Sequence, residues 1–249
     1  MTDRLHILVD FDNLARFSKG KTVEAVLRHI ESKVPDSFLV GRTRIEMRLY
    51  GGWVNGQALT RQAQQLSANL QTSFPSTALR SNSTGTLETR FFNATFARSG
   101  LSLPSELLRD TFVRNRSVRN IYVDQGGWTH CAAPAHCSLS GIEKFINTRE
   151  CHNASCSLSL QDLVKQDEQK QVDTLLVADM AELVLKQAND RVVVVSSDAD
   201  MWPGILLCLG AGASVCHVHT TPGATTKASL LVNLTASPRI RSLYNQISV

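Results

Sequence analysis

The sequence contains no apolar run long enough to cross a membrane. Its 249 residues are 43% hydrophobic, but no stretch approaches the roughly 18 residues that a spanning helix needs. The N-terminal segment MTDRLHILVDFD carries four charged residues, so it lacks the uncharged apolar segment and the small-residue cleavage site of a secretory signal. We therefore expect a soluble, well-cored protein of the cytoplasm that has no membrane partner.

Lysine is absent from residues 80–119, where seven arginines and three acidic residues give a local charge of +4. Arginine suits bidentate contacts with phosphate, and a basic cluster is typical of a nucleic-acid-binding surface. We therefore take Arg114 and Arg116 as candidate substrate-binding residues. A solvated helix face is the alternative interpretation of this cluster.

Strands and helices alternate along most of the chain, which predicts an α/β fold with a central, mostly parallel sheet. The expected strands are 4–10, 44–52, 119–125, 191–200 and 214–219. Apolar residues at helical spacing, or helix-end signals, mark 22–34, 59–70, 175–184 and 203–210. Residues 87–97 fit either a strand or a helix, and the sequence shows no internal repeat and no clear linker.

Two of the expected strands end in aspartates two residues apart. Asp10 and Asp12 close the first strand, and Asp198 and Asp200 follow four consecutive valines. Ligands of open parallel sheets bind beyond the carboxyl ends of the strands, so these acids are expected around one crevice. Clustered carboxylates repel one another, and a hard divalent cation such as Mg²⁺ or Mn²⁺ relieves that repulsion. A water on the cation is the expected nucleophile, and the cation also stabilises charge on a phosphoryl oxygen.

Three segments resemble the NYN branch of the PIN-like nucleases. They are ILVDFDNL near the start, KQVDTLLVADM at 170–180 and VVVVSSDADMWPGI at 192–205, in the order of that family. The resemblance implies a three-layer α/β/α, PIN-like (Rossmann-like) fold around a mostly parallel sheet. It also implies a metal-dependent endoribonuclease that hydrolyses phosphodiester bonds, most readily in single-stranded RNA, although some members cleave DNA.

The resemblance assigns roles to individual residues. The acids that match the family, and that would be catalytic metal ligands, are Asp10, Asp173, Asp198 and Asp200. Asn13 and Lys170 match the family's asparagine and lysine, so we take both as substrate-binding residues; Asn13 would hold Asp10 or a substrate phosphate. Capping the following helix is the simpler role for Asp12 and Asn13, and Asp12 is otherwise an outer partner of the metal ligands. Asp179 lies six residues after Asp173, about 600° around a helix, so the two do not share a face, and we interpret Asp179 as structural or as an outer partner of the metal ligands.

Two positions depart from the family pattern. Gln171 stands where the family prefers glycine and Met201 where it prefers phenylalanine, and neither change removes a metal ligand. Residues 71–118 and 127–158 have no counterpart in a minimal domain of this family. We therefore expect a single NYN/PIN-like domain over 1–249 with insertions at about these two places.

The insertion at 127–158 is rich in cysteine and histidine. In a cytoplasmic chain this composition favours a metal over a disulfide, and two paired knuckles that close one tetrahedral site are typical of structural zinc. The expected zinc ligands are Cys131, Cys137, Cys151 and Cys156, with His130, His136 or His152 as possible replacements. The spacings are mostly wider than usual, so redox-active thiols and incidental cysteines stay open as alternatives. Cys208 and Cys216 lie in apolar context and are expected to be buried thiols.

Two other functions stay open. The strand end at Asp10 and Asp12 also resembles phosphatases of the haloacid-dehalogenase type, although Leu14 stands where that family has threonine or valine. That family also gives no role to Asp173. A non-catalytic RNA-binding or scaffolding module on the same fold is the second alternative, and the presence of all the expected acids counts against it.

Overall fold

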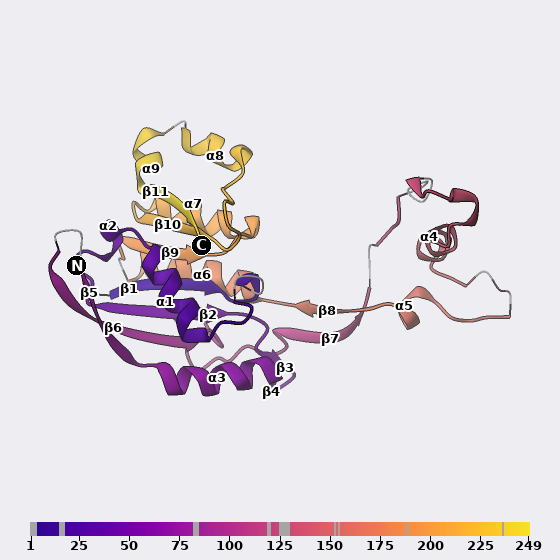
Figure 1. The fold of residues 1–249 in the computed structure, drawn as a ribbon, viewed down its shortest axis with the longest axis horizontal. Helices are drawn as coiled ribbons and strands as arrows, with labels where there is room; N and C mark the ends of the chain where they lie inside the picture. The colour runs from indigo at the N-terminus through magenta and orange to yellow at the C-terminus, as the bar shows by residue number, and fades with distance from the viewer. Residues whose placement is uncertain are drawn as a thin grey trace. The chain divides into compact units, whose positions relative to one another are not determined.

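The computed structural model describes residues 4–14, 18–81, 85–118, 121–124, 130–151, 153, 155–187, 189–235 and 237–249. The chain forms two compact units, one made of residues 1–111 and 169–249 and the other of residues 112–168. Figure 1 labels the helices and strands of both units.

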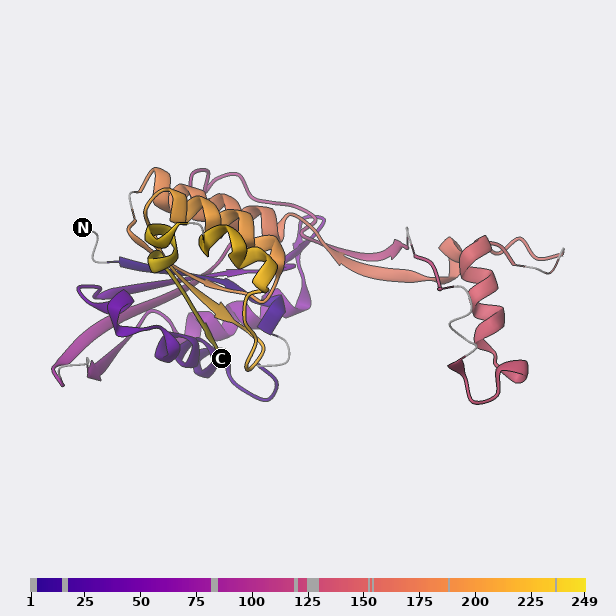
Figure 2. The same ribbon diagram turned by 90° about the horizontal axis from the view of Figure 1, so that it is seen from above.

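The first unit is built on a seven-stranded sheet with helices on both faces (Figure 2). The strand order is β11-β10-β9-β1-β2-β6-β5, and every neighbouring pair is parallel except β5 and β6. The predicted α/β fold with a central, mostly parallel sheet is therefore confirmed. The strands are β1 (Arg4–Asp10), β2 (Arg44–Tyr50), β5 (Ser76–Ser81), β6 (Leu87–Phe96), β9 (Arg191–Val195), β10 (Ser214–His219) and β11 (Tyr244–Ser248).

The remaining elements of this unit cover the sheet or follow its strand ends. The helices are α1 (Val23–Lys33), α2 (Asp36–Leu39), α3 (Arg61–Ser73), α6 (Val172–Leu185), α7 (Trp202–Gly210), α8 (Ala228–Thr235) and α9 (Pro238–Leu243). Two 3₁₀ turns, η1 (Asp12–Leu14) and η4 (Ala199–Met201), follow β1 and β9, and a small hairpin joins β3 (Val54–Asn55) to β4 (Ala58–Leu59).

Alternate residues of the central strands enter two separate cores. On one face, Ile7 of β1 and Val193 of β9 pack with the apolar residues of α1 and α3. On the other face, Leu8 and Val194 pack with those of α6 and α7. A strand with a core on each side must be apolar along its whole length, which explains the continuous valine run of β9.

The second unit has little apolar core of its own. Its elements are β7 (Phe112–Ser117), η3 (Pro134–His136), α4 (Leu139–Thr148), α5 (Leu160–Leu163) and β8 (Lys165–Gln169), and β7 pairs with β8. Among the described residues of 112–168, the buried apolar side chains are Val118 and Leu160. Apolar burial alone therefore contributes little to its stability, and small units of this kind commonly need a metal or another cross-link.

The strand expected at 119–125 is wrong for the residues that the structure describes there. Residues 121–124 belong to no strand, and residues 119, 120 and 125 lie outside the described residues. The backbone of Val123 instead exchanges two hydrogen bonds with the side chain of Asn147, at 3.0 and 3.2 Å. A local apolar run cannot form a ladder without a neighbouring strand, and here a side chain satisfies the backbone instead.

Several boundaries differ from those predicted. Residues 87–97, which fitted two assignments, form the strand β6, which pairs with β2 and β5 of the main sheet. Residues 71–118 thus supply two strands to the central sheet, whereas residues 127–158 lie wholly within the second unit. The strand expected over 191–200 ends at Val195, because the chain turns into η4 beyond it.

Within the described part of the chain, no helix is both long and apolar enough to span a membrane. The longest described helix, α6, has 14 residues, short of the roughly 20 that cross a bilayer.

Candidate metal centre at the carboxyl edge of the sheet

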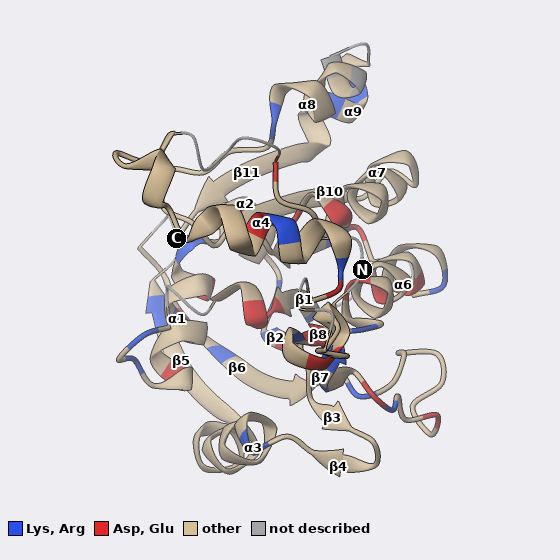
Figure 3. Cartoon of the chain, turned by 90° about the vertical axis from the view of Figure 1, so that its right-hand side faces the viewer, with Lys and Arg blue, Asp and Glu red and all other residues tan. Residues whose placement is uncertain are grey.

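Two neighbouring parallel strands bring the acidic segments together. In β1 and β9, Val9 is paired with Val195, so Asp10 and Ser196 leave the sheet at the same level. The helix α6 begins beside this edge and carries Asp173 in its first turn. Acidic residues, coloured red, lie beside the labels of α6 and α7 in Figure 3.

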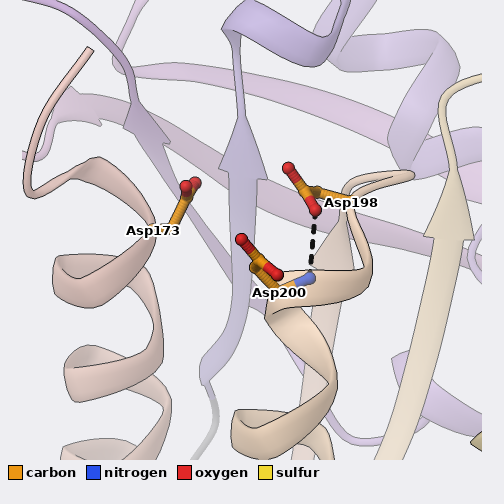
Figure 4. Close-up of side chains that lie close together, drawn as sticks. All are labelled: Asp173, Asp198 and Asp200. Carbon is orange, nitrogen blue, oxygen red and sulfur yellow. Dashed lines mark hydrogen bonds between the residues drawn. The ribbon is translucent and has the colours of Figure 1, made fainter. Parts of the chain in front are cut away.

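Three aspartates form the candidate metal centre. One carboxylate oxygen from each of Asp173, Asp198 and Asp200 lies within 4.8 Å of the other two (Figure 4). Asp198 caps the turn η4 because its Oδ1 accepts a hydrogen bond from the backbone N–H of Asp200 at 3.0 Å. Local capping thus explains the position of Asp198, and the same turn brings the carboxylate of Asp200 close to that of Asp198.

Asp10 is buried and is not a member of this group of three carboxylates. Its Oδ2 accepts hydrogen bonds from Asn13 Nδ2 at 2.6 Å and from Ser196 Oγ at 2.8 Å. Burial raises the pKa of Asp10; these hydrogen bonds oppose the rise, and the charge of Asp198 adds to it. The structure thus gathers three of the four predicted ligands, and it holds the fourth beside them in a fixed orientation.

Burial and the neighbouring carboxylates together disfavour the ionised form of Asp173. Burial, followed by the charges of Asp10, Asp198 and Asp200, raises the pKa of Asp173 to about 6. Carboxylates that share a small space resist simultaneous ionisation, and a bound cation would reverse that effect.

Ser196 joins two of the predicted motifs, although sequence reasoning gave it no role. Its hydroxyl donates to Asp10 and accepts a hydrogen bond from the backbone N–H of Asp198 at 3.0 Å. The serine is fully buried. Its place directly after the buried valines was the available signal, since the first polar residue beyond a central strand lies at the edge where ligands bind.

The other two aspartates near these motifs have structural partners. Asp12 accepts a hydrogen bond from the backbone N–H of Gly52 at 2.8 Å, and so it ties β1 to the end of β2. Asp179 is buried and accepts hydrogen bonds from Arg48 Nε at 2.8 Å and Tyr50 Oη at 2.7 Å. These contacts fit the structural alternative for Asp179.

The predicted substrate-binding residues lie in different surroundings. The side chain of Asn13 donates a hydrogen bond to Asp10. Lys170, which precedes Asp173 by three residues in the sequence, is exposed. In the second unit, Arg116 forms an ion pair with Glu168, and the guanidinium of Arg114 lies 5.8 Å from the ring centre of Phe112.

The arginine cluster read from the sequence divides further in the fold. Arg80 and Arg90 of the first unit both pair with Glu31, and Arg119 lies outside the described residues. Part of the local charge at 80–119 is therefore neutralised within the protein.

The four predicted zinc ligands are free thiols in two pairs separated along the chain by α4. Cys131 and Cys137 contact each other, and hydrogen bonds from the backbone of Ala133 and from Cys137 lower the pKa of Cys131. Among the described residues, no three of these cysteines and their neighbouring histidines come within 4.8 Å of one another. His152 lies outside the described residues.

Comparison with known proteins adds no relative. No family model, no curated protein and no solved structure matches the chain.

Proposed function

We propose that the protein is a divalent-metal-dependent endoribonuclease that hydrolyses phosphodiester bonds in single-stranded RNA. The observation that carries the proposal is the group of Asp173, Asp198 and Asp200 at the carboxyl edge of a parallel sheet, with Asp10 directly behind it. The order of the three NYN-like segments supports the same function.

The donor set fits a hard cation. Three carboxylates within 4.8 Å offer only oxygen, which Mg²⁺ and Mn²⁺ prefer over nitrogen or sulfur. The raised pKa of Asp173 supports the fit, because burial and the neighbouring carboxylates both disfavour its ionised form and a cation would offset both effects. Asp173, Asp198 and Asp200 would hold the ion, and it would supply a water of lowered pKa and positive charge for the phosphoryl oxygen.

The protein's own residues position these carboxylates. Hydrogen bonds from Asn13 and Ser196 fix the orientation of the Asp10 carboxylate. The turn η4 sets the separation of Asp198 from Asp200. A pre-oriented donor set favours catalysis because little reorganisation accompanies the change in charge at phosphorus. Attack by water with departure of the 3′ oxygen would leave a 5′-phosphate and a 3′-hydroxyl, as the resemblance to the family implies.

A pocket of the first unit that is lined by two arginines supports a polyanionic substrate. The pocket measures about 520 Å³ and is lined by Arg98 and Arg109 together with Gln57 and Glu106. Nε of Arg98 is buried and has no hydrogen-bond partner in the described part of the chain. Two guanidinium groups and a buried unpaired donor suit a phosphate, which arginine binds through paired hydrogen bonds.

Thr111 links this Arg98 pocket to the acidic group. Its hydroxyl accepts a hydrogen bond from the backbone N–H of Val54, which lines the pocket, at 2.9 Å. Its carbonyl accepts one from the backbone N–H of Lys170 at 3.0 Å. Lys170 precedes α6 and Asp173, so one strand of nucleic acid could contact the pocket, the lysine and the carboxylates in succession.

We also propose a structural zinc ion in the second unit. Cys131 and Cys137 would supply one half of the site, and Cys151 and Cys156 would supply the other half. Zinc binding would contribute directly to the folding free energy of a unit with few buried apolar residues.

The nuclease is tested with end-labelled single-stranded RNA in Mg²⁺, in Mn²⁺ and in EDTA. We expect cleavage only with the metals, and loss of about 100-fold or more in Asp198→Asn, which keeps the cap but removes a charged ligand. Asp124→Asn, at an exposed carboxylate outside the group, is the matched control and should cleave normally. RNA binding without cleavage would favour the non-catalytic module, and hydrolysis of p-nitrophenyl phosphate alone would favour the phosphatase.

A further inference from the structure

A second pocket shares Asp198 with the acidic group. It measures about 90 Å³, and it opens between the ends of β9 and β10 and the start of α8. Its apolar wall includes Trp202 and Leu230, and Lys227 is the exposed cation on its rim. The proposed metal centre, the Arg98 pocket and the proposed zinc site do not use this space, which we call the Asp198 pocket.

The floor of the Asp198 pocket is a fixed hydrogen-bonded network. His217 Nε2 lies 2.9 Å from the carbonyl oxygen of Ser196, which only accepts, so Nε2 carries the proton. His217 Nδ1 then accepts from Tyr244 Oη at 2.9 Å. Because the hydroxyl proton of Tyr244 is used in the bond to His217, Thr226 Oγ1 donates to Tyr244 Oη at 2.6 Å. The same Oγ1 accepts a hydrogen bond from His219 Nε2 at 3.2 Å.

Both imidazoles of this network are neutral at physiological pH. Burial, together with the neighbouring His219, lowers the pKa of His217 to about 4, and burial also lowers the pKa of His219. Their rings pack with centres 4.2 Å apart. The floor is therefore uncharged and partly aromatic, which suits a flat neutral ring better than a charged group.

We propose that the Asp198 pocket receives the base of the nucleotide whose phosphate lies at the acidic group, and that it selects pyrimidines. This inference rests on the proposed nuclease function. A base is joined to its phosphate through a single sugar, so a phosphate held at Asp198 places that base at the pocket. Trp202 and Leu230 would contact its faces, because ring stacking and apolar contact are the usual means of holding an unpaired base.

The size of the pocket decides between the two classes of base. A cavity of about 150 Å³ accommodates benzene, and the Asp198 pocket, at about 90 Å³ and open on one side, can take one six-membered ring partly inserted. A fused purine is larger by a five-membered ring, so less of it fits in a pocket of this volume. The rim ammonium of Lys227 would bind the phosphate of the same nucleotide.

Equilibrium binding of mononucleotides tests the pocket without turnover, because a 5′-monophosphate has no phosphodiester bond to cleave. Titration calorimetry in Mg²⁺ should show UMP and CMP binding at least about tenfold more tightly than AMP and GMP, as expected for steric exclusion from a small pocket. Ala224→Leu fills the pocket and should remove this preference. Thr221→Leu, at an exposed position on the same loop that does not line the pocket, should keep it.

A second variant keeps the test independent of folding. Lys227→Ala, at an exposed position, should weaken UMP binding by about tenfold through loss of a charge-assisted hydrogen bond while leaving uridine binding unchanged. Equal affinity for UMP and AMP, or pyrimidine selectivity that survives in Ala224→Leu, would overturn the pocket assignment. RNA cleavage without base preference would support the nuclease function and refute the base-binding role of the pocket. Selective UMP binding with no cleavage of RNA would support the base-binding role and refute the nuclease function.

Discussion

Replacement of Asp173 by asparagine should stabilise the metal-free protein above pH 6. The pKa of Asp173 is raised from 3.8 to about 6 by burial and by the neighbouring carboxylates. The folded protein therefore holds this proton more tightly than the unfolded chain, and stability falls as pH rises from about 4 to about 6. Asparagine has a similar shape and no charge, so the variant should escape that loss.

The magnitude follows from the two pKa values. Their difference corresponds to about 3 kcal/mol at 1.36 kcal/mol for each pKa unit. Asp173 is only partly buried, so solvent screening reduces the figure, and we expect a gain of about 1 kcal/mol at pH 7.5. At pH 4, close to the unfolded-state pKa of 3.8, the aspartate is protonated in the folded protein and partly protonated in the unfolded chain, so the gain should be small.

Urea denaturation in EDTA at pH 4 and pH 7.5 measures this effect directly. Asp124→Asn, at an exposed carboxylate outside the group, is the control and should change stability little at either pH. Added Mg²⁺ should stabilise the unmodified protein and the control, and it should stabilise Asp173→Asn much less, because a ligand is missing. A variant that is less stable than the unmodified protein at pH 7.5 in EDTA would refute the repulsion on which the metal site is based.

Three further predictions address the other parts of the site. Asp10→Asn should keep the fold and lose RNA cleavage in Mg²⁺; full activity of this variant in EDTA would eliminate the metal mechanism. Purified protein should contain about one zinc ion per chain, and chelation should lower the melting temperature of the second unit; a metal-free sample that melts unchanged would end the zinc proposal. Arg98→Ala with Arg109→Ala should weaken RNA binding similarly for all sequences and reduce its salt dependence, since phosphate contacts release counterions. Arg116→Ala should change the salt dependence less, because its guanidinium is paired with Glu168; the opposite ranking would assign substrate binding to the second unit.

Equal charges in the sequence have unequal environments in the fold. Arg80, Arg90 and Arg98 are close in the chain, yet the first two share Glu31 and the third lines a pocket. Composition shows the local excess of arginine, but elements distant in the chain determine the partner of each arginine. Glu31 comes from α1, and no local pattern indicates that it faces β5 and β6.

The C-terminal part of the site was not foreseen for a similar reason. His217 and His219 appear in the sequence as alternate polar residues of a short strand, and β11 has no clear apolar pattern. Their network forms because β11 pairs beside β10 and brings Tyr244 to His217. Pairing between strands is a non-local event, so local periodicity does not predict it.

Local physics alone accounts for much of this protein. Four buried valines demand a strand covered on both faces, and an aspartate directly after such a strand must lie at the carboxyl edge of the sheet. The α/β class, the central strands and the acidic edge therefore follow from short stretches of sequence.

The partners of the individual aspartates depend on packing between distant segments. Asp10 and Asp198 follow comparable strands, yet Asp10 is withdrawn by Ser196 and Asn13, whereas Asp198 meets Asp173 and Asp200. Asp12 is two residues from Asp10 and is held by Gly52 at the end of another strand. A carboxylate at a strand end is specified locally, but its partners are specified by the strand order and by where α6 begins, because those determine which backbone and side-chain donors come within hydrogen-bonding distance.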